Sequence, residues 1–183
     1  HSVEEYNRLM SQKHSVSAGY RKPILPPPVE SLVTKAGQSA VLALDVYNRP
    51  STTFRTEAFI VLMIIAWTAL FHAIFEKRGQ SYFYLDDFGQ PKTIAGDEKA
   101  WELNTCLREY YGQANPPVRQ NLQFMIELRN KIEHRFSPEI DLKVAGECQA
   151  MLLNFDELMV AEFGKYYAIQ EYLCVPLYTS HRR

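Results

Sequence analysis

AFIVLMIIAWTALFHAIF, residues 58–75, is a run of eighteen residues without a formal charge. A run of this length is close to the minimum that spans a bilayer, but the central helix of a bundle has the same hydropathy. Thr68 and His72 interrupt the run, and the other helices that the sequence predicts are amphipathic. We therefore expect a buried central helix and no membrane contact. The alternative is a membrane protein anchored by this segment.

The segments on either side of this run predict further helices. In residues 31–48 apolar side chains recur at steps of three and four, and Asn48-Arg49-Pro50 ends the pattern. Asp97 is the predicted N-cap of the helix that follows it, and Gly164 is a candidate break in the last helix. The other predicted helices cover residues 98–111, 118–135 and 137–172.

Residues 81–96 differ in composition from the predicted helices, with aromatic and β-branched side chains on either side of an Asp86-Asp87-Phe88-Gly89-Gln90 turn. This pattern predicts a short hairpin, with Asp86 and Asp87 as turn residues and not as a metal pair. The fold class is therefore all-α, a four- to five-helix bundle with a small inserted β-hairpin. Four prolines between residues 23 and 28 favour an extended arm. The predicted divisions are an N-terminal arm at 1–29, a helical domain at 30–175 and a tail at 176–183.

The composition limits the classes of function. The 183 residues include 20 Lys and Arg against 21 Asp and Glu, a formal net charge of −1. This balance excludes a generally basic protein that coats nucleic acid, so any nucleic-acid contact must be local. The three cysteines lie far apart, which favours a reducing cytoplasm and predicts neither a disulfide framework nor a zinc site. We predict no metal and no cofactor.

The chemistry is concentrated in NLQFMIELRNKIEHRF, residues 121–136. Asn130 and His134 are four residues apart and share one surface of a helix, and the long side chain of Arg129 can reach toward them. A helical projection predicts that the core face consists of Phe124, Met125, Leu128 and Ile132.

His134 falls in the last turn of this predicted helix. A helix C-terminus favours the imidazolium form of histidine, and the charge of Glu133 acts in the same direction. We therefore hypothesise that His134 exchanges a proton near neutral pH. In the alternative, Arg129 pairs with Glu133 on a solvated face and His134 is a surface residue. Glu57 is most simply a favourable charge in the first turn of its helix, and His72 is most simply a hydrogen-bonded residue of the core or of an interface.

Arg129-Asn130-Lys131-Ile132-Glu133-His134 resembles the R-x4-6-H signature of the HEPN superfamily, in the variant in which a polar residue directly follows the arginine. Residues 40–48, followed by Phe54-Arg55-Thr56-Glu57-Ala58-Phe59, are similar to an uncharacterised HEPN-like family of bacterial proteins. The resemblance covers about residues 30–172.

This resemblance implies a metal-independent endoribonuclease of the toxin or phage-defence type, with RNA as substrate and a composite site formed across a homodimer. His134 is then the general acid or base, Arg129 stabilises charge on the phosphate, and Asn130 orients the pair or binds phosphate. Glu57 and Glu133 are possible supporting residues. An antitoxin or an additional domain is a possible partner.

Several alternatives stay open. The same resemblance fits a non-catalytic module that binds RNA or mediates dimerisation within a larger protein. One toxin subgroup carries a modifiable tyrosine where this chain has Phe136, which puts inhibition by that modification in doubt. We expect the dimer interface on the His134 face of the helix, because Leu122 and Ile126 project there beside the polar residues.

Overall fold

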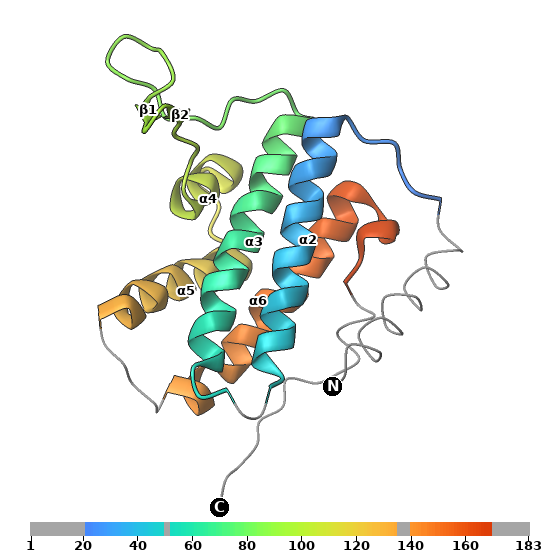
Figure 1. The fold of residues 1–183 in the computed structure, drawn as a ribbon, viewed down its shortest axis with the longest axis vertical. Helices are drawn as coiled ribbons and strands as arrows, with labels where there is room; N and C mark the ends of the chain where they lie inside the picture. Colours follow the sequence, from blue (N-terminus) through green and yellow to red (C-terminus); the bar gives the residue numbers. More distant parts are fainter. Residues whose placement is uncertain (1–20, 50–51, 135–139, 170–183) are drawn as a thin grey trace, which may run out of the picture.

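The computed structural model describes residues 21–49, 52–134 and 140–169, without the side chains of 133, 134 and 140–143. This part of the chain is an all-α bundle of five α-helices with one small inserted hairpin, as predicted (Figure 1). Its elements are α2 (Pro27–Tyr47), α3 (Arg55–Lys77), β1 (Thr93–Ile94), β2 (Asp97–Glu98), α4 (Leu103–Tyr111), α5 (Pro117–His134), α6 (Ile140–Phe163) and the 3₁₀ turn η2 (Lys165–Tyr167).

Helices α2 and α3 run side by side in opposite directions, with α4 and α5 on the other side of α3 (Figure 1). The face of α2 toward the core carries Ala36, Ala40 and Ala43, none of which has any exposed surface. Small side chains at steps of three and four allow two helix backbones to approach closely. The apolar run therefore becomes the central helix of the bundle.

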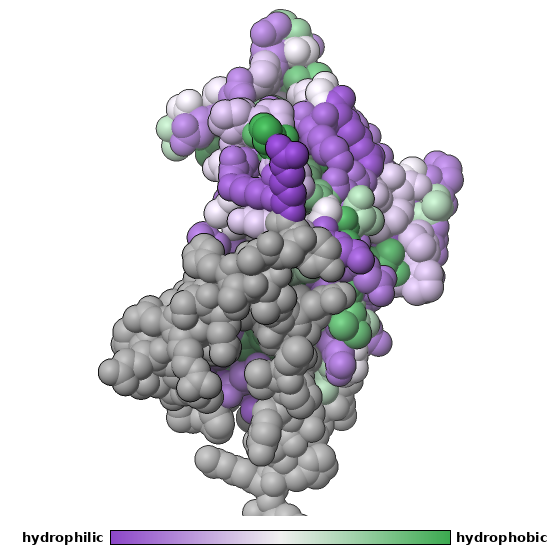
Figure 2. Space-filling view, turned by 90° about the vertical axis from the view of Figure 1, so that its right-hand side faces the viewer, coloured by the Kyte–Doolittle hydropathy of each residue, from purple (hydrophilic) through white to green (hydrophobic). Residues whose placement is uncertain are grey.

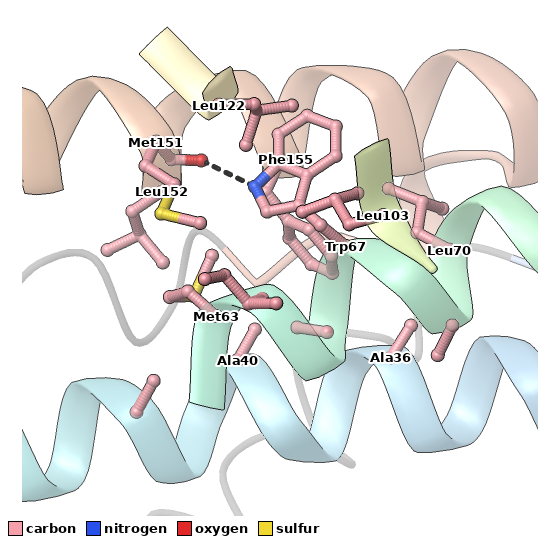
Figure 3. Packing of buried hydrophobic residues seen from close by; sticks show 14 of the residues in the cluster. Ala36, Ala40, Met63, Trp67, Leu70, Leu103, Leu122, Met151, Leu152 and Phe155 are labelled. Carbon is pink, nitrogen blue, oxygen red and sulfur yellow. Dashed lines mark hydrogen bonds between the residues drawn. The ribbon is translucent and has the colours of Figure 1, made fainter. Parts of the chain in front are cut away.

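Trp67 anchors α3 against α6 (Figure 3). Its indole Nε1 donates a hydrogen bond to the Met151 carbonyl oxygen at 3.2 Å, and its ring meets Phe155 edge-on at 5.6 Å between centroids. The bond satisfies the only polar atom of the indole, so the whole side chain can be buried.

Burial also bears on the membrane alternative. Within the described residues α3 is the one helix whose length and composition would suit a bilayer, and 67% of its most apolar window is buried inside the bundle. The described residues on the face drawn in Figure 2 are mainly hydrophilic. This is the packing of a core helix, as expected for residues 58–75, and it does not favour an anchor.

Helix α2 begins earlier than the sequence predicts. Pro27 and Pro28 occupy its first turn, where a missing N–H costs nothing and the fixed φ of proline suits a helix. Val29 is 1% exposed and packs in the core. The helix therefore starts four residues before the predicted Ser31. Residues 1–20 and 170–183, most of the predicted arm and all of the tail, lie outside the described residues.

The inserted hairpin has the predicted turn and a second one. The Asp86 carboxylate accepts hydrogen bonds from the amides of Phe88 and Gln90 at 2.9 and 2.8 Å, which confirms it as a turn residue. The paired strands β1 and β2 lie farther on and are joined by Ala95 and Gly96, with φ of 54° and 93°.

The prediction that Asp97 caps a helix was wrong. Asp97 lies in β2, and α4 starts at Leu103. The Trp101 amide donates to the Tyr82 carbonyl at 2.7 Å, and the Lys99 amide donates to the Lys92 carbonyl at 2.7 Å. These cross-strand bonds of the inserted hairpin hold the backbone extended where local capping preferences favour a helix.

Helix α6 ends at Phe163 and does not continue to Tyr172. Gly164 has φ of 94°, a left-handed conformation that glycine adopts without steric cost, and η2 follows it. The break near Gly164 is confirmed. The predicted start of this helix at Ser137 lies outside the described residues.

Candidate functional site

The buried face of α5 is rotated from the predicted one. Phe124, predicted for the core, is 43% exposed, whereas Leu122 is fully buried together with Met125. The Asn121 side-chain amide donates to the Glu147 backbone carbonyl of α6 at 3.1 Å and turns this side of α5 inward. The core face predicted from periodicity was therefore wrong for Phe124.

This rotation changes the position of Arg129. Leu122, Met125 and Ile132 form a buried stripe with spacings of three and seven, and Arg129 falls four residues after Met125 on the same stripe. Arg129 is half-buried in consequence. Because Leu122 is buried in the core of its own chain, it cannot contribute to the predicted dimer interface.

A pocket of about 490 Å³ lies over α3, which runs between α2 and the pair α4 and α5 (Figure 1). Helix α3 supplies its floor, and α2, α5 and the segment leading into α4 supply its walls. The residues that line it are Leu32, Lys35, Ile64, Ile65, Thr68, Ala69, His72, Ala100, Trp101, Glu102, Leu103, Asn104, Ile126, Arg129 and Asn130. The volume is in the range of small-molecule and nucleotide sites.

The charges around the pocket favour an anion. Arg129 contributes a guanidinium whose Nη1 donates to the Asn130 side-chain oxygen at 3.2 Å. Lys35 contributes an ammonium that forms no ion pair with the residues that the structure describes. The one carboxylate in the lining, Glu102, has Lys99 at 3.4 Å. The net charge of the lining is therefore positive.

His72 is the titratable group in the floor of the pocket. Its Nε2 lies 2.8 Å from the Trp101 carbonyl oxygen, and because a carbonyl only accepts, Nε2 carries the hydrogen. Burial lowers the pKa of His72, the bond to Trp101 raises it, and the charge of Lys35 lowers it, with a net lowering. At neutral pH the ring is neutral, and Nδ1 is a hydrogen-bond acceptor.

The comparison with protein families adds one finding. A family model described as Domain of unknown function (DUF3644) matches residues 31–183. The chain belongs to this family. No curated protein and no solved structure matches the chain. All the residues that line the pocket lie within the part of the chain that matches DUF3644.

The structure of this DUF3644 domain brings together some of the predicted site residues. Arg129 and Asn130 both line the pocket. Glu57 does not line it: this residue is 3% exposed in the first turn of α3, fifteen residues before His72, or about 22 Å along the helix axis. The backbone of α5 continues to His134, one turn beyond Asn130, and the side chains of Glu133 and His134 lie outside the described residues.

His72 and Lys35 are not among the site residues that the sequence predicts. Thr68 and His72 are four residues apart, so they lie on one face of α3, and both line the pocket. Two polar residues at this spacing on an otherwise apolar helix are the sequence feature that could have identified His72 as a site residue. Lys35 had no such signal, because α2 carries other exposed polar residues and only the packing of α2 on α3 selects this one.

Other chemistries find less support in the described part of this DUF3644 domain. No group of three His, Cys, Asp or Glu side chains lies close enough there to hold a metal ion. Burial raises the pKa of the Cys106 thiol to about 12, so this thiol is protonated at neutral pH and is a poor nucleophile.

Proposed function

We propose that this DUF3644 domain binds RNA in the pocket and cleaves it without a metal ion. The observation that carries the proposal is that Arg129 and Asn130, the first two residues of the R-x4-H sequence, line a pocket whose net charge is positive. A neutral imidazole, that of His72, lies in the same pocket. The resemblance to the HEPN superfamily, which rests on the same sequence, supports the proposal.

The reaction needs two kinds of group. Attack of the ribose 2′-oxygen on phosphorus places additional negative charge on the phosphate oxygens, and a guanidinium such as that of Arg129 stabilises this charge through paired hydrogen bonds. The 2′-hydroxyl must lose a proton and the departing 5′-oxygen must gain one. His134 follows Asn130 by one helical turn and is proposed as a proton-transfer group.

The site is proposed to be composite, formed by two copies of the chain in the cytoplasm. Two copies of the α5 sequence would supply two arginines and two histidines around one phosphodiester. Light scattering at micromolar concentration tests this part, and a monomer that cleaves RNA would contradict it.

The cleavage assay uses structured and single-stranded RNA in EDTA, with identification of the product ends. The wild type is expected to give 2′,3′-cyclic phosphate and 5′-hydroxyl ends, and His134→Ala is expected to lose at least about 100-fold in rate. Lys131→Ala is the matched control, because Lys131 is an exposed residue of the same helix that does not line the pocket. This variant should cleave at the wild-type rate.

Two results would contradict the proposal. Cleavage of DNA of the same sequence would exclude attack by a 2′-hydroxyl. Intact RNA with the wild type, together with RNA binding that depends on Arg129, would favour a non-catalytic binding module.

A further inference from the structure

His72 lies outside the sequence that suggested the function, yet it occupies the floor of the same pocket as Arg129. Two contacts fix the orientation of its ring. Nε2–H donates to the Trp101 carbonyl at 2.8 Å, and the ring stacks on Tyr82 with 4.5 Å between centroids and 20° between planes. An imidazole held through one nitrogen presents the other nitrogen in a defined direction.

The nitrogen that remains is an acceptor. Nδ1 of His72 has no hydrogen-bond partner among residues 21–49, 52–134 and 140–169, and the ring is partly exposed. A histidine with one N–H bonded to a fixed acceptor and the other nitrogen open to a pocket has the arrangement of a general base. The Trp101 carbonyl also stabilises the imidazolium that forms when Nδ1 takes up a proton.

The charges around His72 come from every element packed against it. Lys35 on α2 disfavours the imidazolium. Arg129 on α5 and Glu102 before α4 line the same pocket, and Glu76, one turn farther along α3, interacts with Tyr82, the residue on which the His72 ring stacks. Burial is the largest of these effects and lowers the pKa of His72, so the ring is neutral at neutral pH. His134 lies on α5 one helical turn beyond Asn130 and is the second imidazole of the proposed site. An imidazole that is neutral at neutral pH is suited to accept a proton, which leaves the donation of a proton to the second imidazole.

Resting on the proposed function, we propose that His72 is the general base of RNA cleavage and His134 the general acid. Nδ1 of His72 takes the proton of the 2′-hydroxyl, the 2′-oxygen forms a bond to phosphorus, and the bond from phosphorus to the 5′-oxygen breaks. The leaving oxygen takes a proton from the His134 imidazolium, and Arg129 neutralises the charge on the phosphate oxygens. The products are a 2′,3′-cyclic phosphate and a 5′-hydroxyl, and proton exchange with water restores both histidines.

The test uses two substitutions that separate the two nitrogens of His72. His72→Gln can keep an N–H donor near the position of Nε2 and so the bond to Trp101, but it has no base in place of Nδ1. His72→Asn can keep an acceptor near the position of Nδ1, but it cannot be protonated in this pH range. Circular dichroism and thermal unfolding identify which variant folds, and the cleavage rate of a folded variant is compared with that of the wild type.

Single-turnover cleavage is measured in EDTA from pH 5 to 8. The wild-type rate should fall as the pH is lowered, because protonation of His72 removes the base. His72→Gln and His72→Asn should each lose about 100-fold at pH 7, with RNA affinity changed less than threefold, and the decline in rate at acidic pH should disappear. Imidazole added to His72→Ala should restore part of the rate.

The outcomes separate this inference from the proposed function. A wild type that cleaves, with His72→Gln cleaving at the same rate, overturns the role of His72 and leaves the ribonuclease proposal standing. A slow His72→Gln that keeps the acidic decline also overturns it, because the titrating group is then elsewhere. A wild type that cleaves no RNA overturns both.

Discussion

Two groups of polar side chains lie against α3, and they differ in whether their charges are paired within the protein. The first group is centred on Glu162 of α6, whose carboxylate accepts from Arg78 Nη2 at 2.6 Å and from the Tyr110 hydroxyl at 3.4 Å. Lys77 Nζ lies 3.5 Å from the same carboxylate. Here cations and anion face each other, and the interactions join the end of α3 to α4 and α6.

The second group lines the pocket and is not balanced in this way. Lys35 has no ion pair within the described chain, Nδ1 of His72 has no donor there, and the carboxylate of Glu102 faces Lys99. A polar group whose partners all lie in the protein contributes to stability, whereas one that still needs a partner is suited to a ligand. The Glu162 group should therefore affect stability, and the pocket group should affect function.

The largest expected effect is on cleavage by Arg129→Ala. Loss of the guanidinium removes the group that stabilises charge on the phosphate, so the cleavage rate should fall by about 100-fold or more. Arg78→Ala is the matched control, because it removes an arginine of the Glu162 group. Equal loss of cleavage in both variants would remove the distinction between the two groups.

Glu162→Gln should have the opposite profile. It weakens the ion pairs to Lys77 and Arg78, whose side chains are partly exposed, so the free energy of unfolding should fall by about 1 kcal/mol. This corresponds to a decrease in Tm of about 2–4 °C, measurable by calorimetry. The cleavage rate at 25 °C should not change, and a marked loss of activity would link this group to the site.

Lys35→Gln should have a smaller effect, confined to binding. Lys35 is exposed, and removal of one such cation should weaken RNA affinity by about threefold to fivefold. The slope of log K against log salt should decrease by about 0.7, the value for one phosphate of a single strand. Fluorescence anisotropy at several salt concentrations gives both quantities, and an unchanged slope would exclude contact between Lys35 and phosphate.

The smallest effect is on the pH dependence of stability. The pKa of His72 is lowered in the folded protein, so below about pH 6.5 the unfolded chain binds a proton that the folded chain does not. This contribution to stability is present above pH 6.5 and is lost as the pH falls through the folded pKa. Denaturant titrations from pH 5 to 7 should show a shallower acid-side decline for His72→Gln, by a fraction of the limiting slope of about 1.4 kcal/mol per pH unit. A steeper decline would contradict the direction of the shift.

The sequence predicts the helices of this fold well because burial repeats along them. It predicts the orientation of α5 less well, since Phe124 and Leu122 lie on two competing apolar arcs and only the partner helices select between them. Asp97 has a local capping preference for a helix, but in the structure it pairs with Ile94 in the two-stranded hairpin. Lys35 and His72 are separated by almost forty residues, and only the packing of α2 on α3 places both at one pocket.

The base of the inserted hairpin has an evolutionary consequence. The amide of Trp101 is bonded to the carbonyl of Tyr82, and these two residues hold the His72 ring by a hydrogen bond and by stacking. Because this hydrogen bond joins the two ends of the inserted segment, the segment of eighteen residues between them can become longer or shorter without moving the imidazole. Insertions and deletions between Tyr82 and Trp101 should be tolerated by natural variation, whereas changes at Tyr82 and Trp101 themselves should not.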